Sequence, residues 1–152
     1  MSNIKLSENF YLSEFMISDY AERNGIDNTP PEELIKNGRA LCNNVLQELR
    51  DYLLRPIIVT SGYRSHELNK AIGGSDRSQH MEFKAADITV PGFEVQDIIK
   101  LVKMLHLNFD QCINEFDRWV HISYNEGNNR NQFLKAYKKD GKTVYEKMEV
   151  NA

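Results

Sequence analysis

Cysteine is scarce in this sequence of 152 residues, and the two that occur, Cys42 and Cys112, lie far apart. They make neither a CxxC pair nor the dense cysteine framework that holds small secreted domains together. We therefore expect two buried free thiols, neither of which is a good candidate for a nucleophile.

Long apolar runs are missing as well. No stretch approaches membrane-spanning length, and the first ten residues lack the apolar core of a signal peptide. We expect no membrane insertion, and synthesis in the cytoplasm without an export route of the protein's own. An excess of charge is also absent, since the formal net charge is -3. Nucleic acid is therefore not an expected partner, because it calls for a clustered basic surface.

The remaining composition is that of an ordinary globular protein, with 41% hydrophobic and 27% charged residues. The sequence contains no repeat, no low-complexity tract and no linker rich in proline, glycine and serine. This length suits one hydrophobic core rather than two. We expect a single domain over residues 1–152, present as a monomer.

Helical periodicity occurs in two stretches. Residues 29–32, Thr-Pro-Pro-Glu, read as a capping box with proline at the first helical position, and apolar residues at helical spacing follow. A long amphipathic helix is predicted over residues 30–53. A second helix is predicted over residues 93–106. Ser65 is a plausible cap for a further segment.

Short runs rich in β-branched residues predict strands over residues 56–60, 85–90, 111–115 and 119–124. The pair Asp140-Gly141 is a hairpin turn signal, so the late chain is expected to be an antiparallel meander. The order of elements predicts an α+β fold, in which helices pack on one face of a small mixed or antiparallel sheet.

Three residues are candidate metal ligands: His80, Asp87 and His121. Alternation along the predicted strands points Asp87 away from the face of Ala86 and Ile88, and it gives His121 similar geometry. A catalytic zinc needs three such ligands and an open position for water. By itself the pattern is weak, because the HExxH helix motif is absent and two hydrogen-bonded structural histidines are an alternative.

A family resemblance strengthens this interpretation. It rests on segments that occur in order along most of the chain: residues 6–10, 25–31, 61–65 (Ser-Gly-Tyr-Arg-Ser), 78–80 (Ser-Gln-His) and 119–123 (Trp-Val-His-Ile-Ser). Together they resemble the peptidase M15 family of zinc peptidases, which includes D-Ala-D-Ala carboxypeptidases, dipeptidases and several phage endolysins. The resemblance implies the hedgehog/D-Ala-D-Ala peptidase type of fold.

Carried over by position, the resemblance implies that His80, Asp87 and His121 bind Zn²⁺ and that Arg64 contacts a substrate carbonyl or carboxylate. An arginine fork suits such planar oxygen pairs, although Arg64 is also interpretable as a surface or salt-bridging residue. The family uses an acidic general base shortly before its last histidine. Glu115, six residues ahead of His121, is favoured here over Asp117, four ahead.

Ser78 and Trp119 complete the set of candidate substrate-binding residues, and Ser78 is equally typical of turn chemistry. Two departures from the family pattern stand out. Phe83 occupies a position where members commonly have glycine, and His66 one where they commonly have proline. Phe83 is therefore expected to narrow the pocket or alter the loop.

The function implied is that of a zinc-dependent peptidoglycan peptidase, which cuts a stem-peptide or cross-link bond with water activated by zinc and Glu115. Its partners are then peptidoglycan peptides, and its setting is that of a phage endolysin that reaches the cell wall once the host membrane is permeabilised. One alternative is a non-catalytic zinc module that binds a wall peptide or a protein. Another is a different cut, such as dipeptide hydrolysis in the cytoplasm or cleavage between L-Ala and D-Glu.

Overall fold

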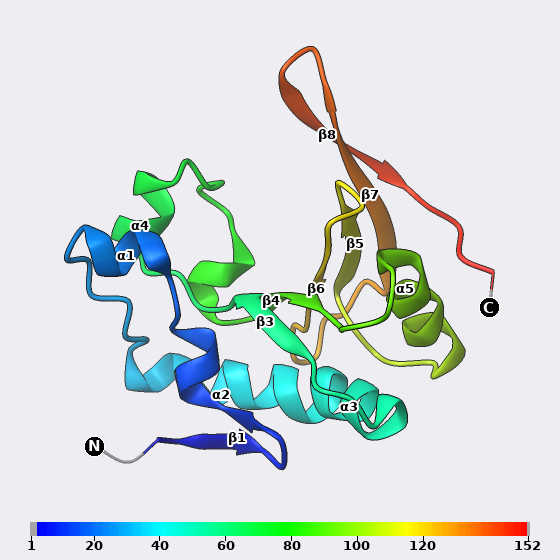
Figure 1. Cartoon of the computed structure of the whole chain (residues 1–152), viewed down its shortest axis with the longest axis horizontal. Helices are drawn as coiled ribbons and strands as arrows, with labels where there is room; N and C mark the ends of the chain where they lie inside the picture. The colour runs from blue at the N-terminus through cyan, green and yellow to red at the C-terminus, as the bar shows by residue number, and fades with distance from the viewer. Residues whose placement is uncertain (1–2, 152) are drawn as a thin grey trace.

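A six-stranded sheet forms the centre of the computed structural model, which describes residues 3–151 (Figure 1). In spatial order the strands are β3 (Ile58–Ser61), β4 (Ala85–Thr89), β6 (Trp119–Ser123), β5 (Gln111–Glu115), β7 (Gln132–Lys139) and β8 (Lys142–Lys147). All neighbours pair antiparallel except β5 and β7, which are parallel. The predicted α+β class with a small mixed sheet is confirmed.

The late chain does not form the simple antiparallel meander that the sequence predicted. The hairpins β5–β6 and β7–β8 exist, but β7 pairs with β5 rather than with β6, and it does so in parallel. The connection over residues 124–131 returns to the start of β5, where Gln132 N donates to Asp110 O at 3.0 Å and Asn131 N donates to Phe109 O at 2.9 Å. Alternation assigns faces but not partners, so the pattern left this crossover undetermined.

The predicted long helix over residues 30–53 is present, and it is formed by α2 (Glu32–Leu41), the π-helical turn η2 (Cys42–Leu46) and α3 (Gln47–Leu53). Its predicted capping box is wrong, because the N-cap is Pro31 and makes no side-chain cap bond. A residue before proline is biased towards extended backbone, so the helix begins after the second proline rather than at Thr29. The Thr29 amide donates to Asp27 Oδ1 instead.

Helices α2, α3 and α5 (Val95–Met104) bury their apolar residues in one core with the sheet. Ala86 and Ile88 of β4 and Val120 and Ile122 of β6 belong to this core. The predicted alternation is therefore correct, and Asp87 and His121 point to the opposite face. The helices cover one face of the sheet, and the other face is free to carry a site.

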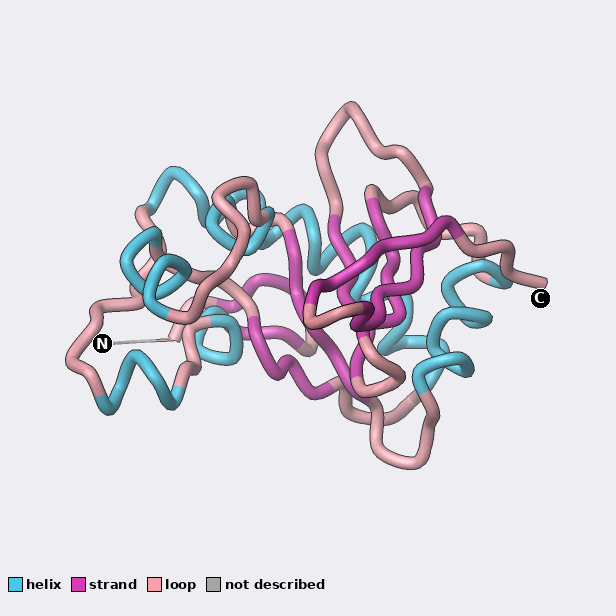
Figure 2. The backbone as a smooth tube through the Cα atoms, turned by 90° about the horizontal axis from the view of Figure 1, so that it is seen from above, coloured by secondary structure: helices cyan, strands magenta, loops and turns pink. Residues whose placement is uncertain are grey.

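Short elements lie at the end of the molecule away from α5 and the C-terminus (Figure 2). They are β1 (Lys5–Ser7), β2 (Phe10–Tyr11), η1 (Leu12–Phe15), α1 (Asp19–Arg23), α4 (His66–Ala71) and η3 (Gln79–Glu82). The predicted cap Ser65 is found at the start of α4, where its Oγ accepts from the amide of Leu68 at 3.1 Å. Across the described residues, no helix is both long and apolar enough to cross a membrane.

Phe83 lies in the core rather than in a pocket. Its side chain is fully buried, and its ring centroid is 5.5 Å from that of Phe15 and 6.0 Å from that of Tyr63. The expected narrowing of the pocket by Phe83 is therefore not found. Its backbone is left-handed, with φ 59°, at the C-cap of η3. That conformation suits the glycine common in the family, so the packing of the ring offsets a locally strained backbone.

Cys42 and Cys112 are free and buried, as expected. Burial raises the pKa of each thiol far above its ordinary range. The thiolate needed for nucleophilic chemistry is thus disfavoured at both positions.

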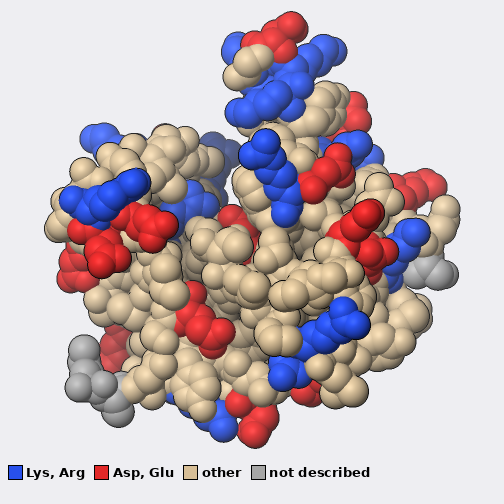
Figure 3. Space-filling model, in the orientation of Figure 1, with Lys and Arg blue, Asp and Glu red and all other residues tan. Residues whose placement is uncertain are grey.

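The β7–β8 hairpin projects from the body of the molecule (Figure 1), and Figure 3 shows lysine and arginine side chains gathered over it. Lys135, Lys138, Lys139 and Lys142 are all exposed. Between this hairpin and the part that carries α1 and α4, the surface is hollowed (Figure 3).

Candidate metal centre

His80 is held in place by hydrogen bonds from three directions. It lies in η3, whose N-cap Ser78 accepts from the His80 amide through Oγ at 3.2 Å. Its Nδ1 lies 2.6 Å from the carbonyl oxygen of Gly62, so Nδ1 carries the proton and donates it. The His80 carbonyl accepts from the amide of Arg64 at 3.1 Å. This arrangement fixes the tautomer and leaves the lone pair on Nε2.

Gly62 is required at its position because of a close approach. A Cβ there would lie 2.6 Å from Cα of Phe15. The bare backbone of Gly62 thus packs against η1 while its carbonyl orients the His80 ring. A backbone carbonyl that accepts a hydrogen bond from a ligating histidine sets which imidazole nitrogen is free to bind a metal.

Asp87 and His121 come from adjacent strands and lie directly opposite each other in the register of β4 and β6. Asp87 Oδ1 is 3.0 Å from His121 Nδ1 and 3.4 Å from His80 Nε2. The candidate ligand atoms of the three residues all lie within 4.8 Å of one another. The structure thus brings together the three residues that the sequence predicted as ligands.

The electrostatics of the cluster favour an ionised Asp87 and a neutral His80, and they shift His121 towards its protonated form. Burial lowers the pKa of His80. Burial also opposes ionisation of Asp87, but the two histidines outweigh it and hold the pKa of Asp87 well below its usual range. For His121, burial again disfavours the charged form, yet the hydrogen bond to Asp87 raises the pKa.

The donor set fits a zinc ion. Two imidazole nitrogens and one carboxylate are typical ligands of catalytic zinc, with a fourth position left for water. His80 Nε2 is fully buried and has no hydrogen-bond partner among the described residues. A buried nitrogen with a lone pair and no partner carries a desolvation cost of about 1–3 kcal/mol, which coordination of a cation removes.

A cavity of about 700 Å³ opens over this cluster. Its lining includes His80 and His121 together with the predicted residues Arg64, Ser78 and Glu115. The other lining residues are Gly73, Gly74, Ser75, Arg77, Gln79, Gln111, Ile113, Arg130, Leu134 and Tyr145. Asp117 and Trp119, also predicted, are not among the described residues that line it.

Glu115 ends β5 beside the metal-binding residues. Its Oε1 lies 4.0 Å from His121 Nδ1 and accepts a hydrogen bond from the indole nitrogen of Trp119 at 2.8 Å. Trp119 therefore orients the carboxylate of Glu115 and does not line the cavity itself.

Asp117 occupies the turn after β5 and has left-handed backbone, with φ 56°. Its Oδ1 accepts from the side-chain amide of Asn114 at 2.8 Å, and its own amide donates to Asn114 Oδ1 at 2.9 Å. These bonds give Asp117 a role in shaping the turn.

A family model described as Peptidase M15 matches residues 8–123, which is more than half of the chain. The chain belongs to the peptidase M15 family. No curated protein matched it. For this M15 peptidase, family membership implies a hydrolase, and the matched segment contains every ligand and candidate base described above.

Arg64 follows β3 and reaches the cavity of this M15 protein from the side of α4. Its Nη1 donates to Asn69 Oδ1 at 3.1 Å, while its buried Nε has no partner among residues 3–151. A Cβ at Gly74 would collide with the Asn69 side chain and lie 2.9 Å from Arg64 Nη1. Gly74 is thus the residue that leaves room for the guanidinium.

Sequence reasoning missed several residues around this M15 site. The carbonyl of Gly62 carries no side-chain signal. Arg77, Arg130 and Tyr145 line the cavity from loops and from β8, and no motif marked them. The latter two lie beyond the segment that the family model matches.

Proposed function

We propose that this protein is a zinc-dependent peptidase that hydrolyses a peptide bond in the stem or cross-link peptides of peptidoglycan. The observation that carries the proposal is the buried, unpartnered Nε2 of His80 beside Asp87 and His121, at a cavity that Glu115 also lines. A buried, converging set of donors next to an accessible carboxylate is typical of metal-assisted hydrolysis.

His80, Asp87 and His121 would hold the zinc, which, when bound, supplies Lewis acidity and lowers the pKa of a bound water to about 7. Glu115 is the general base: its carboxylate accepts a proton from the attacking water and later delivers it to the departing amine. Trp119 holds Glu115 in place through the 2.8 Å bond to Oε1, which leaves Oε2 for the proton.

Arg64 binds the substrate carbonyl or carboxylate in this proposal. Burial lowers its pKa from the ordinary value, although a guanidinium remains charged at neutral pH. Its Nη1 donates to Asn69, which fixes the side chain, and the residue lines the cavity. A positioned donor of this kind stabilises negative charge that develops on oxygen.

The proposed setting is that of a phage endolysin, which meets the wall after the host membrane is permeabilised. The resemblance to a family that includes carboxypeptidases and endolysins of peptidoglycan supports it, as does a cavity large enough for several residues of a peptide. A monomer acting on peptidoglycan peptides is sufficient for this role.

The test is a digest of purified peptidoglycan of several wall types, read by mass spectrometry, with the wild type, Glu115→Gln and the matched control Asp117→Asn. We expect new fragments from the wild type and a loss of about a hundredfold or more in Glu115→Gln, with bound zinc unchanged. Asp117→Asn should retain activity to within a few-fold. Fragment masses identify the bond that is cut.

If the wild type binds zinc but releases no fragment from any wall type, the peptidase proposal is wrong and a non-catalytic zinc module takes its place. If Asp117→Asn loses activity while Glu115→Gln keeps it, the assignment of the base is wrong.

A further inference from the structure

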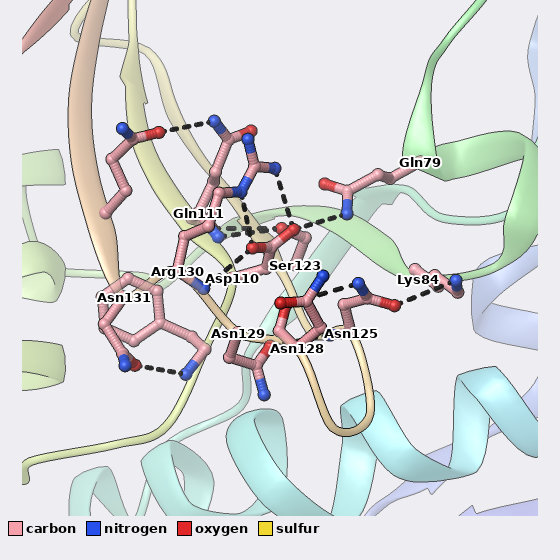
Figure 4. Close-up of polar contacts among 12 residues, drawn as sticks. Gln79, Lys84, Asp110, Gln111, Ser123, Asn125, Asn128, Asn129, Arg130 and Asn131 are labelled. Atoms are coloured by element: carbon pink, nitrogen blue, oxygen red, sulfur yellow. Dashed lines mark hydrogen bonds and ion pairs between the residues drawn. The ribbon is translucent and has the colours of Figure 1, made fainter.

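Arg130 is anchored at the cavity wall by a buried carboxylate (Figure 4). Its Nε donates to Asp110 Oδ1 at 2.8 Å, and its Nη2 donates to Asp110 Oδ2 at 2.9 Å. The Asp110 side chain is only 2% exposed, whereas that of Arg130 is 54% exposed. The buried Asp110 carboxylate therefore holds the guanidinium of Arg130, which is partly exposed at the cavity.

The anchor itself is fixed on several sides. The Arg130 amide donates to Asp110 Oδ1 at 3.0 Å, and Gln79 Nε2 donates to Asp110 Oδ2 at 2.8 Å (Figure 4). These bonds, with Arg130 making the largest contribution, lower the pKa of Asp110 to about 2. Asp110 is thus ionised at neutral pH, and its position ties the loop before β7 to the segment that carries His80.

The geometry leaves one edge of the guanidinium free. Arginine has five N–H donors in a planar fork, and Asp110 occupies the edge formed by Nε and Nη2. Among residues 3–151, no hydrogen bond engages Nη1. The remaining edge of Nη1 and Nη2 presents two parallel donors, the arrangement that binds a carboxylate in bidentate fashion.

The charges around the cavity point the same way. Its lining holds three arginines, Arg64, Arg77 and Arg130, and among the described residues the only acidic group in that lining is Glu115. Asp110 and Asp87 are ionised but buried and already hydrogen-bonded, so the free donors of this wall are cationic and suit an anionic ligand. Arg64 follows the edge strand β3 and Arg130 precedes β7, which is three strands further along the sheet than β4, so the two approach the cavity from different sides.

We propose that Arg130, held by Asp110, forms a second carboxylate-binding subsite of the cavity, separate from Arg64. The inference rests on the proposed function in one respect, namely that the ligand is a peptide of the stem type. The substrate class that follows is a peptide with an ionised carboxylate away from the bond that is cut. Arg130 lies outside the segment matched by the family model, which covers residues 8–123.

The test measures binding, so that it does not depend on turnover. The probes are a stem tetrapeptide with free carboxylates on its glutamate and diaminopimelate residues, and two versions in which one or the other carboxylate is amidated. Titration calorimetry is done with zinc-loaded protein in a Glu115→Gln background, which leaves the peptide intact. We expect one of the two amidated peptides to bind about tenfold or more weakly than the acid, the range of a charge-assisted hydrogen bond.

Adding Arg130→Gln should abolish that difference in affinity. It should weaken binding of the peptide with free carboxylates and leave binding of the corresponding amidated peptide unchanged. Adding Asp110→Asn should reduce it, because the guanidinium loses its anchor. Arg23→Gln, an exposed arginine in the last turn of α1, is the matched control and should preserve it.

Three results overturn the inference: equal affinities for acid and amides, a difference that survives Arg130→Gln, or no binding of any peptide. The proposed function is judged separately by fragment release from peptidoglycan. A protein that cleaves the wall but binds acid and amide equally retains the function and loses the subsite. One that discriminates through Arg130 but cleaves nothing retains the subsite and loses the catalytic role.

Discussion

Single atoms decide how the centre is arranged. The Gly62 carbonyl determines which nitrogen of His80 carries the proton, and the pairing of Asp87 with His121 in the register of β4 and β6 brings the other two ligands together. Two glycines are needed because there is no room for a side chain. A methyl group at Gly62 would meet the backbone of Phe15, and one at Gly74 would meet Asn69 and Arg64. A small substitution near the site is therefore expected to lower activity by displacing a functional side chain, without removing any functional group.

Gly74→Ala tests this expectation for Arg64. The added Cβ collides with the Asn69 side chain and crowds Arg64 Nη1, so the guanidinium must move. We expect a decrease in kcat/KM of about tenfold to a hundredfold, the size of effect that an ångström of misplacement produces, with zinc content unchanged. The measurement is kcat/KM on the wall peptide that the wild type cleaves most readily.

An Arg64→Ala background is the control for that variant. If Gly74→Ala acts through Arg64, it has little further effect once the guanidinium is gone, and a double-mutant cycle shows strong coupling. Additive losses would contradict the account.

Much of the site was predictable at the residue scale. The spacing of His80, Asp87 and His121 together with the family resemblance identified three residues that the structure places together. The Gly62 carbonyl and Arg130 were not predictable, because a backbone acceptor leaves no mark in the sequence and Arg130 stands in an asparagine-rich loop without periodicity. Their proximity arises only from the path of the chain through space.

Asp87 and His121 lie in the middle of two interior strands, whereas Glu115 is the last residue of its strand. The strands β4, β5 and β6 present Asp87, Glu115 and His121, and η3 presents His80 between two capping interactions. The two predicted long helices and the strands of the six-stranded sheet were located well by periodicity and β-branched runs, whereas the short elements β1, β2 and α1 were not predicted. The crossover that sets β7 beside β5 was missed, since it depends on hydrogen bonds of Asp110 and Phe109 made by a loop.

Phe83→Gly tests the balance between strain and packing at the end of η3. Glycine relieves the left-handed backbone, worth about 1–2 kcal/mol, but removal of a fully buried phenylalanine costs about 3–5 kcal/mol. We expect a net loss of about 1–4 kcal/mol in the free energy of unfolding, measured by urea denaturation. A more stable variant would show that strain outweighs packing there.

The loop anchored on Asp110 should contribute a pH-dependent part of the stability. Its pKa is lowered from 3.8 to about 2 in the folded protein. The contribution is therefore fully present above about pH 4 and lost as the pH falls towards 2. We expect Asp110→Asn to be less stable than the wild type by about 1–2 kcal/mol at pH 7. The gap should shrink between about pH 4 and pH 2 in urea titrations, and a gap that is constant over this range would contradict the ion-pair explanation.

At the scale of the whole molecule, one face of the sheet is covered by α2, α3 and α5, and the opposite face carries the metal-binding residues. The β7–β8 hairpin and the loop before it lie outside the segment that the family model matches, yet Leu134 and Tyr145 of the hairpin line the cavity. The fold class followed from the order of elements and the resemblance. The part of the cavity lining that the hairpin contributes could not be predicted in this way, because it depends on the parallel pairing of β5 with β7.

Metal binding should stabilise the folded protein, because the ligands converge only when β4, β6 and η3 are assembled. Removal of zinc is expected to lower Tm by several degrees in a thermal denaturation, as for any ligand that binds the native state alone. His80→Ala should respond little to added zinc. An equal response of both proteins would place the metal elsewhere.

The most direct test of the central claim is the rate of fragment release from peptidoglycan by one wild-type sample as purified, after dialysis against a chelator, and after zinc is restored. The account predicts release, loss of release and recovery, with about one zinc ion bound per chain in the active states. Release that persists after the metal has been removed would contradict it.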